Sequence, residues 1–345
     1  MLSEGPVRNK KAQRAAWLSL LSGGLYAGGS WFAARALADR LISPEGLAPA
    51  SEGREHLLAA LRETGAFVAD YRHPGSARHP VELAAVFASP GQPATRPTIL
   101  FLHGKGGNTA EWRPDALRAL RCGYNALLPD LRGHRPSGGS FVTYGFLEKE
   151  DLANSLNAAR ERFALDPKRL GLHGCSAGST AALEFAADNA AVHALWLESP
   201  YAEPRAMARH YLALTTGLPP WFLGLTARWA VRHAIARVRR ELALAPGEKG
   251  LDRVDPLAAV RRVRGSVCLV YGEEDGLVPP PFAEKLASAL PPGSSVWRVE
   301  KAGHCHHDNE PARVVAQEYE RRWVEFFQNS LPVREGRTPG ATLDS

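Results

Sequence analysis

The sequence has little cysteine, and its cysteines lack the spacing of a zinc site or of a redox motif. Cys122, Cys175, Cys268 and Cys305 are spread along the chain, and no two of them form a C-x-x-C pair. In a chain of 345 residues this excludes a zinc-finger module and a small disulfide-stapled scaffold. We expect reduced thiols, with two disulfides in an exported protein as the alternative.

Lysine is also scarce: the basic residues are 34 Arg and only 8 Lys, and they form no single basic tract. The net charge of +6 is accompanied by no nucleic-acid-binding motif, so we expect no nucleic-acid partner. With 45% hydrophobic and 23% charged residues, the chain is typical of a globular protein with a sizeable core, which excludes a collagenous, coiled-coil or wholly disordered chain.

The longest stretch free of charge lies near the N-terminus. Residues 15–34 form a run of twenty residues, twelve of them Ala, Gly or Ser, with Trp17 and Trp31 near its ends. As a helix the run is about 30 Å long, enough to cross a bilayer. Four basic residues precede it, which predicts a cytoplasmic N-terminus and a catalytic domain on the non-cytoplasmic side. The alternatives are a cleaved signal peptide and a helix packed on a soluble, cytoplasmic or exported, protein.

The remaining chain alternates predicted strands and helices. We expect residues 1–40 to form an N-terminal segment, 41–64 a linker and short helix, 65–330 one α/β domain, and 331–345 a polar tail. The predicted strands are 67–71, 81–88, 98–102, 125–128, 170–173, 194–198, 266–271 and 295–299, and the helices from the third strand onward are 110–121, 146–163, 177–188, 280–290 and 311–328. This order predicts an eight-stranded, mostly parallel sheet covered on both faces, with an insertion at 199–265.

A candidate nucleophile follows the fifth predicted strand. The residues Gly174-Cys-Ser176-Ala-Gly178 match G-x-S-x-G between a strand and a helix, where a tight turn exposes a serine hydroxyl and the glycines permit close packing. The alternative is an ordinary glycine-rich turn capped by serine. The strand–turn–helix context favours the nucleophile.

Serine needs a general base, and the base needs an acid to orient it. Three carboxylates, Glu273, Glu274 and Asp275, follow the seventh predicted strand, and His304 follows the eighth. A metal site is the alternative for the histidine-rich run that begins at His304. Consecutive residues cannot all converge on one ion, so we expect no metal.

A third component is the loop that starts at His103-Gly104 and ends at Asn108. Backbone N–H groups in such a loop can stabilise a developing oxyanion. The expected donors are the amides of Lys105 and Ala177. A phosphate-binding loop is the alternative, but neither the P-loop spacing nor a dinucleotide-binding pattern is present.

Together these stretches resemble the α/β-hydrolase family. The matching motifs are His103-Gly104…Asn108, Pro129-Asp130-Leu-Arg-Gly133-His134-Arg-Pro-Ser-Gly138, Gly174-Cys-Ser176-Ala-Gly178, Asp255-Pro256-Leu257, Gly272-Glu-Glu-Asp275…Val278-Pro279 and Ala302-Gly303-His304. The loop with Asn108 is similar to that of the membrane-associated lipase and acylglycerol-hydrolase branch. The resemblance implies a triad of Ser176, Asp275 and His304, with Cys175 and Cys305 as departures from commoner patterns.

The resemblance implies a serine hydrolase that cleaves a carboxylic ester without a cofactor, on a small-molecule or lipid-like substrate. A thioesterase, a serine peptidase and a non-catalytic scaffold remain alternatives, because one triad serves several acyl groups and a fold does not fix a function. We expect the insertion to form a helical lid. Its apolar stripe of Val231, Ile235, Val238 and Leu242 predicts either packing on the core or contact with an acyl chain or lipid.

Overall fold

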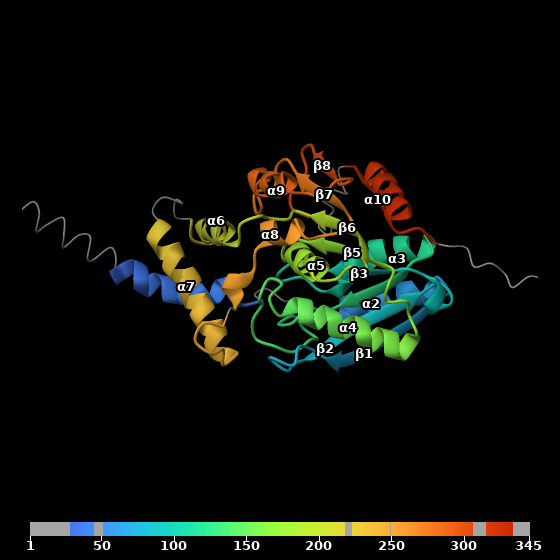
Figure 1. Cartoon of the computed structure of the whole chain (residues 1–345), viewed down its shortest axis with the longest axis horizontal. Helices are drawn as coiled ribbons and strands as arrows, with labels where there is room; N and C mark the ends of the chain where they lie inside the picture. The colour runs from blue at the N-terminus through green and yellow to red at the C-terminus, as the bar shows by residue number, and fades with distance from the viewer. Residues whose placement is uncertain (1–27, 45–50, 218–222, 249, 306–314, 334–345) are drawn as a thin grey trace, which may run out of the picture.

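The computed structural model describes residues 28–44, 51–217, 223–248, 250–305 and 315–333. Within them, eight strands form one sheet in the order β1-β2-β4-β3-β5-β6-β7-β8 (Figure 1). The strands are β1 (Phe67–Pro74), β2 (Glu82–Ser89), β3 (Thr98–Leu102), β4 (Asn125–Pro129), β5 (Leu170–Cys175), β6 (Val192–Glu198), β7 (Ser266–Gly272) and β8 (Ser295–Val299). β2 pairs antiparallel with β1 and β4, and the other neighbours pair in parallel. The predicted mostly parallel sheet is confirmed.

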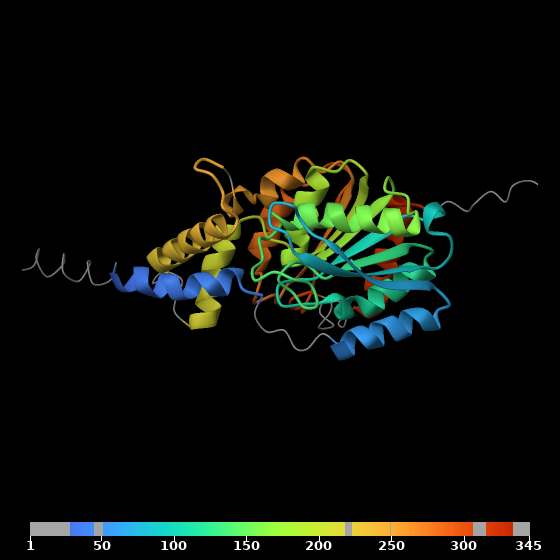
Figure 2. The same ribbon diagram turned by 90° about the horizontal axis from the view of Figure 1, so that it is seen from below.

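Helices cover both faces of the sheet, as Figure 2 shows for α4 and α2. One face packs against α4 (Glu148–Phe163), α5 (Ala177–Ala187), α8 (Pro256–Val260) and α9 (Pro280–Ala287), and the other against α2 (Ser51–Glu63), α3 (Arg113–Arg121) and α10 (Ala316–Ser330). In β3, Leu100 and Leu102 enter the first core while Ile99 and Phe101 enter the second. Because side chains alternate along a strand, a strand buried on both faces is apolar throughout.

A third apolar cluster lies at one end of the molecule. Residues 28–42 form a helix that packs with α6 (Pro204–Thr216) and α7 (Gly224–Glu241), and Figures 1 and 2 both place these helices together. Ala34 and Ile42 are buried in the same apolar cluster as Ala230 and Val238. The helices between β6 and β7 therefore pack on the N-terminal segment as well as on the domain.

Some boundaries differ from those predicted. The first predicted helix after β3 begins as a 3₁₀ turn at Thr109–Trp112 and continues as α3, and α9 ends at Ala287 rather than at residue 290. The last helix, α10, begins at Ala316; residues 311–314 of the predicted helix lie outside the described residues. Short helices end wherever the local backbone finds other hydrogen-bond partners, so their ends are the least predictable parts.

The predicted membrane span falls only partly on the described residues. Residues 15–27 lie outside them, and residues 28–34 belong to the helix that packs on α7. Of the helices that the structure describes, none has both the length and the apolar character needed to cross a bilayer.

Candidate active site

Ser176 lies at the sharp turn between β5 and α5. Its backbone has φ 53° and ψ −116°, a strained conformation that non-glycine residues rarely adopt and that is concentrated at functional sites. The turn is fixed to the end of β6, because the Ser176 N–H donates to the carbonyl oxygen of Glu198 at 2.9 Å. The Ser179 hydroxyl donates to the carbonyl oxygens of Gly174 and Glu198 at 2.8 and 2.9 Å.

The two elbow glycines are required by close backbone packing. A Cβ atom on Gly178 would lie 2.0 Å from the carbonyl oxygen of Leu102, and one on Gly174 would lie 2.7 Å from the carbonyl oxygen of Gly178. These distances are far inside van der Waals contact. The start of α5 therefore approaches the ends of β3 and β5 as the motif predicts.

His304 and Asp275 meet although they are 29 positions apart in the sequence. The His304 Nδ1 atom lies 2.8 Å from Asp275 Oδ2. Asp275 is buried, and its Oδ1 atom accepts from the backbone N–H groups of Leu277 and Val278 at 3.0 and 2.7 Å. Both carboxylate oxygens are thus fixed, and Nε2 of His304 is the nitrogen that remains for a nucleophile.

The two carboxylates that precede Asp275 lie elsewhere than beside His304. Glu273 pairs with Arg298 at 2.5 Å, and Glu274 is exposed. Gly272, at the end of β7, makes the arrangement possible because a Cβ there would lie 2.2 Å from the carbonyl oxygen of Gly303. Of the three carboxylates, Asp275 alone makes a hydrogen bond to His304.

The loop after β3 borders the same cavity as Ser176. Lys105 and Ala177 both line that cavity. The N–H of Gly106 donates to His134 Nε2 at 3.0 Å, and burial lowers the pKa of His134, which favours the neutral ring that can accept this bond. The Gly106 amide therefore points toward His134.

Buried ionic groups hold this loop from behind. Asp130, at the end of β4, accepts from the Thr109 N–H at 3.0 Å and from Arg54 at 2.5 Å. Burial raises the pKa of Asp130 to about 6. His103 Nε2 accepts from the Leu131 N–H at 3.0 Å. Asp130 thus fixes the residue that follows the loop.

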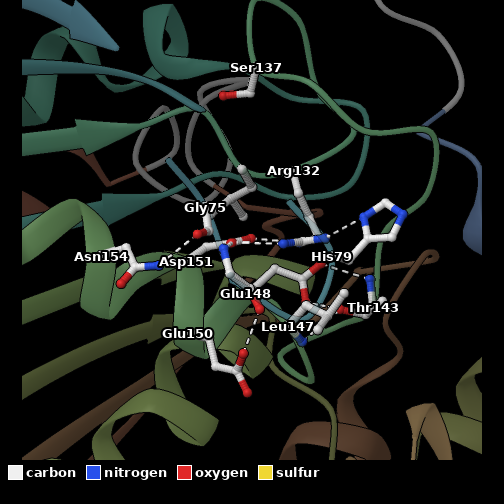
Figure 3. A network of polar contacts seen from close by, with 12 residues as sticks. Gly75, His79, Arg132, Ser137, Thr143, Leu147, Glu148, Glu150, Asp151 and Asn154 are labelled. Atoms are coloured by element: carbon white, nitrogen blue, oxygen red, sulfur yellow. Dashed lines mark hydrogen bonds and ion pairs between the residues drawn. The ribbon is translucent and has the colours of Figure 1, made fainter. Parts of the chain in front are cut away.

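The segment between β4 and α4 is fixed by the polar network in Figure 3. Arg132 forms two hydrogen bonds to the buried carboxylate of Asp151, at 2.6 and 2.7 Å. Glu148 accepts from the backbone N–H groups of Thr143 and Gly145 at 2.7 and 2.8 Å. The network positions the stretch that contains His134 and Tyr144.

A cavity of about 760 Å³ opens beside Ser176 and His304. Much of its wall is apolar and comes from elements outside the sheet. It includes Leu41, Ile42, Tyr144, Met207, Tyr211, Val231, Ile235, Leu251 and Val254. In the apolar stripe, Val238 and Leu242 pack in the third apolar cluster, as the packing interpretation predicts. Val231 and Ile235 line the cavity.

The expectation of four reduced thiols is wrong for two of the cysteines. Cys175 and Cys305 form a disulfide, while Cys122 and Cys268 are unpaired. Ligand-type atoms of Cys175, His304 and Cys305 lie within 4.8 Å of one another. The two sulfur atoms are bonded to each other and so offer no thiolate to a metal. The pairing joins residues 130 apart in sequence, which spacing alone does not reveal.

A buried polar cluster beneath the elbow was not predicted. His173 Nε2 lies 2.9 Å from Glu198 Oε1, which also accepts from Trp196 at 3.0 Å and from the Tyr319 hydroxyl. His173 Nδ1 accepts from Trp323 at 3.2 Å. The only sequence signal is polar residues within the apolar strands β5 and β6. The cluster supports the strands on which the elbow is built.

The family match covers the residues of the candidate active site. The chain belongs to the Alpha/beta hydrolase family, whose pattern it matches over residues 99–318. This stretch begins in β3 and includes the elbow, Asp275 and His304. The mostly parallel sheet and the helices on both of its faces agree with that assignment.

Individual relatives are more distant. The chain is 25% identical over 209 residues to the uncharacterized protein YqkD of Bacillus subtilis, a match that spans 60% of this chain and 64% of that one. The Pyrococcus furiosus esterase Pf2001 superposes with a TM-score of 0.60 at 20% identity, covering 78% of this chain and 95% of the esterase. A puromycin-hydrolyzing peptidase of Mycobacterium tuberculosis gives 0.57 at 18% identity, covering 79% and 40%. These structures share the fold of this chain.

Proposed function

We propose that the protein is a serine hydrolase that cleaves carboxylic esters through an acyl-enzyme intermediate. The observation that carries the proposal is the hydrogen bond from His304 to the buried Asp275, beside the same cavity as the strained Ser176. The named esterase among the structural relatives supports an ester substrate. Thioesters and peptides are the second class, supported by the named peptidase.

In this proposal each group has one role. The Ser176 hydroxyl attacks the ester carbonyl carbon while His304 Nε2 takes its proton, and Asp275 stabilises the resulting imidazolium through Nδ1. The N–H groups of Lys105 and Ala177 stabilise the oxyanion. His304 returns the proton to the leaving alcohol, then takes one from the water that attacks the acyl-enzyme, and finally restores the Ser176 hydroxyl.

A panel of p-nitrophenyl esters of increasing chain length, with a thioester and an anilide alongside, tests the substrate class. We expect turnover of the esters and the highest kcat/KM for a chain that fills the apolar part of the cavity. Faster turnover of the thioester or anilide at equal acyl chain would assign the second class. No turnover of any substrate would indicate a scaffold.

The wall of the cavity predicts how chain length is selected. Ile235 lines the cavity from α7, and the next residue, Ala236, is exposed. Ile235→Trp adds an indole to the acyl space, so kcat/KM for the longest accepted ester is expected to fall about tenfold or more while an acetate ester is little affected. The measurement is the ratio of the two kcat/KM values.

Ala236→Trp is the matched control, since it places the same side chain on the outer face of α7. It should leave the ratio unchanged. If both variants change the ratio equally, or if neither changes it, α7 does not select the acyl chain.

We also propose that the run of residues 15–34 anchors the protein in a membrane through the part that precedes the helix packed on α7, with the catalytic residues on the non-cytoplasmic side. The disulfide supports this side, because disulfides persist in oxidising compartments. The full chain should then resist extraction from membranes by salt and carbonate, and protease added to spheroplasts should digest it. Release by salt or carbonate would contradict the anchor, and a mature N-terminus near residue 37 would identify a signal peptide.

A further inference from the structure

Two cysteines flank the two groups that exchange a proton in the proposed mechanism. Cys175 directly precedes Ser176, Cys305 directly follows His304, and their disulfide brings the two Cα atoms to 6.0 Å. Both cysteines are fully buried. A ring nitrogen of His304 lies within 4.8 Å of both sulfur atoms. The bridge therefore links the nucleophile's strand to the loop of the base, next to the imidazole.

The chain before His304 is held by backbone contacts to the end of β7. The N–H groups of Glu273 and Glu274 donate to the carbonyl oxygens of Val299 and Ala302, both at 2.9 Å. Gly272 packs closely under the carbonyl oxygen of Ala302, where a Cβ would lie at 2.3 Å. These contacts tie the base's loop to the segment that bears Asp275. They do not tie it to Ser176.

The chain after His304 is held differently. Cys305 has a φ of 54°, in the left-handed region that is unfavourable for a residue with a side chain. Its N–H donates to the Ser199 hydroxyl at 3.2 Å, and its sulfur is bonded to Cys175. A strained backbone conformation persists only where the surroundings fix it. The disulfide is the covalent part of that restraint.

We propose that the Cys175–Cys305 disulfide is a positioning element that sets His304 against Ser176. The inference rests on the proposed function and adds to it. Proton transfer requires hydrogen-bond distance, and a shift of about 1 Å in a catalytic group costs on the order of 10²-fold in rate. The backbone contacts fix His304 relative to Asp275, and the disulfide fixes the pair relative to the nucleophile.

The test is a double-mutant cycle with Cys175→Ala, Cys305→Ala and the double variant. Each single variant is expected to lower kcat for a short ester by about 10- to 100-fold while KM changes by less than about twofold. The double variant should resemble the singles, because either substitution already removes the bond. Cys122→Ala, at an unpaired cysteine away from the cavity, is the control and should keep the wild-type kcat.

Alkylation of the denatured protein checks that the bond exists in the enzyme under assay. Before reduction two thiols should react, those of Cys122 and Cys268, and after reduction four. Four reactive thiols before reduction would overturn the proposal.

Two kinetic results would also overturn it. One is a set of cysteine variants that have a lower Tm than the wild type but keep the wild-type kcat at an assay temperature well below that Tm. A bridge that only stabilises the fold gives that result. The other is a pair of losses that add in the double variant, since the side chains would then act separately. Failure of the proposed function gives a different result: either the wild type turns over no substrate, or Ser176→Ala keeps the wild-type activity, whatever the cysteine variants do.

Discussion

Replacing Ser176 by alanine is expected to lower kcat for every substrate by about 10⁴- to 10⁶-fold. Ser176 is the side chain displayed by the strained turn, and its backbone geometry is set by Glu198 and by the close approach of α5. Removal of one hydroxyl therefore leaves the site intact and deletes only the nucleophile. The measurement is kcat on the preferred ester, together with Tm.

Ser288→Ala is a suitable control for that experiment. Ser288 is exposed after α9, and its hydroxyl donates to the carbonyl oxygen of Lys285 at 2.8 Å. It should keep the wild-type kcat. A Ser176→Ala variant with wild-type Tm and more than a tenth of the wild-type activity would show that another group is the nucleophile.

Asp275→Asn is expected to lower kcat by about 10⁴-fold with little change in Tm. An amide keeps the shape of the side chain but loses the charge that stabilises the imidazolium. It also changes the partner of His304 Nδ1, now 2.8 Å from a carboxylate oxygen. The measurement is kcat with the same short ester.

Glu273→Gln and Glu274→Gln are the matched controls, because they make the same chemical change on adjacent residues. Glu273 pairs with Arg298 outside the site and Glu274 is exposed. Both variants should retain activity within about threefold, as is usual for exposed ion pairs and surface groups. Equal losses in all three variants would withdraw the assignment of Asp275.

The sheet and the meeting of Asp275 with His304 follow from local patterns. β3 consists of Thr98–Leu102, as predicted. A strand buried on both faces of a parallel sheet is apolar almost throughout, so a short apolar run between turn residues indicates such a strand. Parallel strands end at one edge of the sheet. The motifs that follow β3, β5, β7 and β8 therefore lie at that edge.

Other features depend on contacts between distant segments. No local pattern pairs Cys175 with Cys305 or places His173 beside Glu198, since each contact is set by the order of strands in the sheet. Leu41 and Ile42 fall in the predicted linker that begins at residue 41, yet they line the cavity because the helix of residues 28–42 packs on α7. Apolar periodicity shows that a helix buries one face, but not against what.

Labelling with a fluorophosphonate probe tests the central claim most directly. The probe forms a covalent bond with an activated serine, so intact mass should show one adduct per chain and peptide mapping should place it on Ser176. The Ser176→Ala variant should take up none, and Asp275→Asn should react far more slowly than wild type. An unlabelled wild-type protein, or an adduct that persists in Ser176→Ala, would contradict the assignment of Ser176 as the nucleophile.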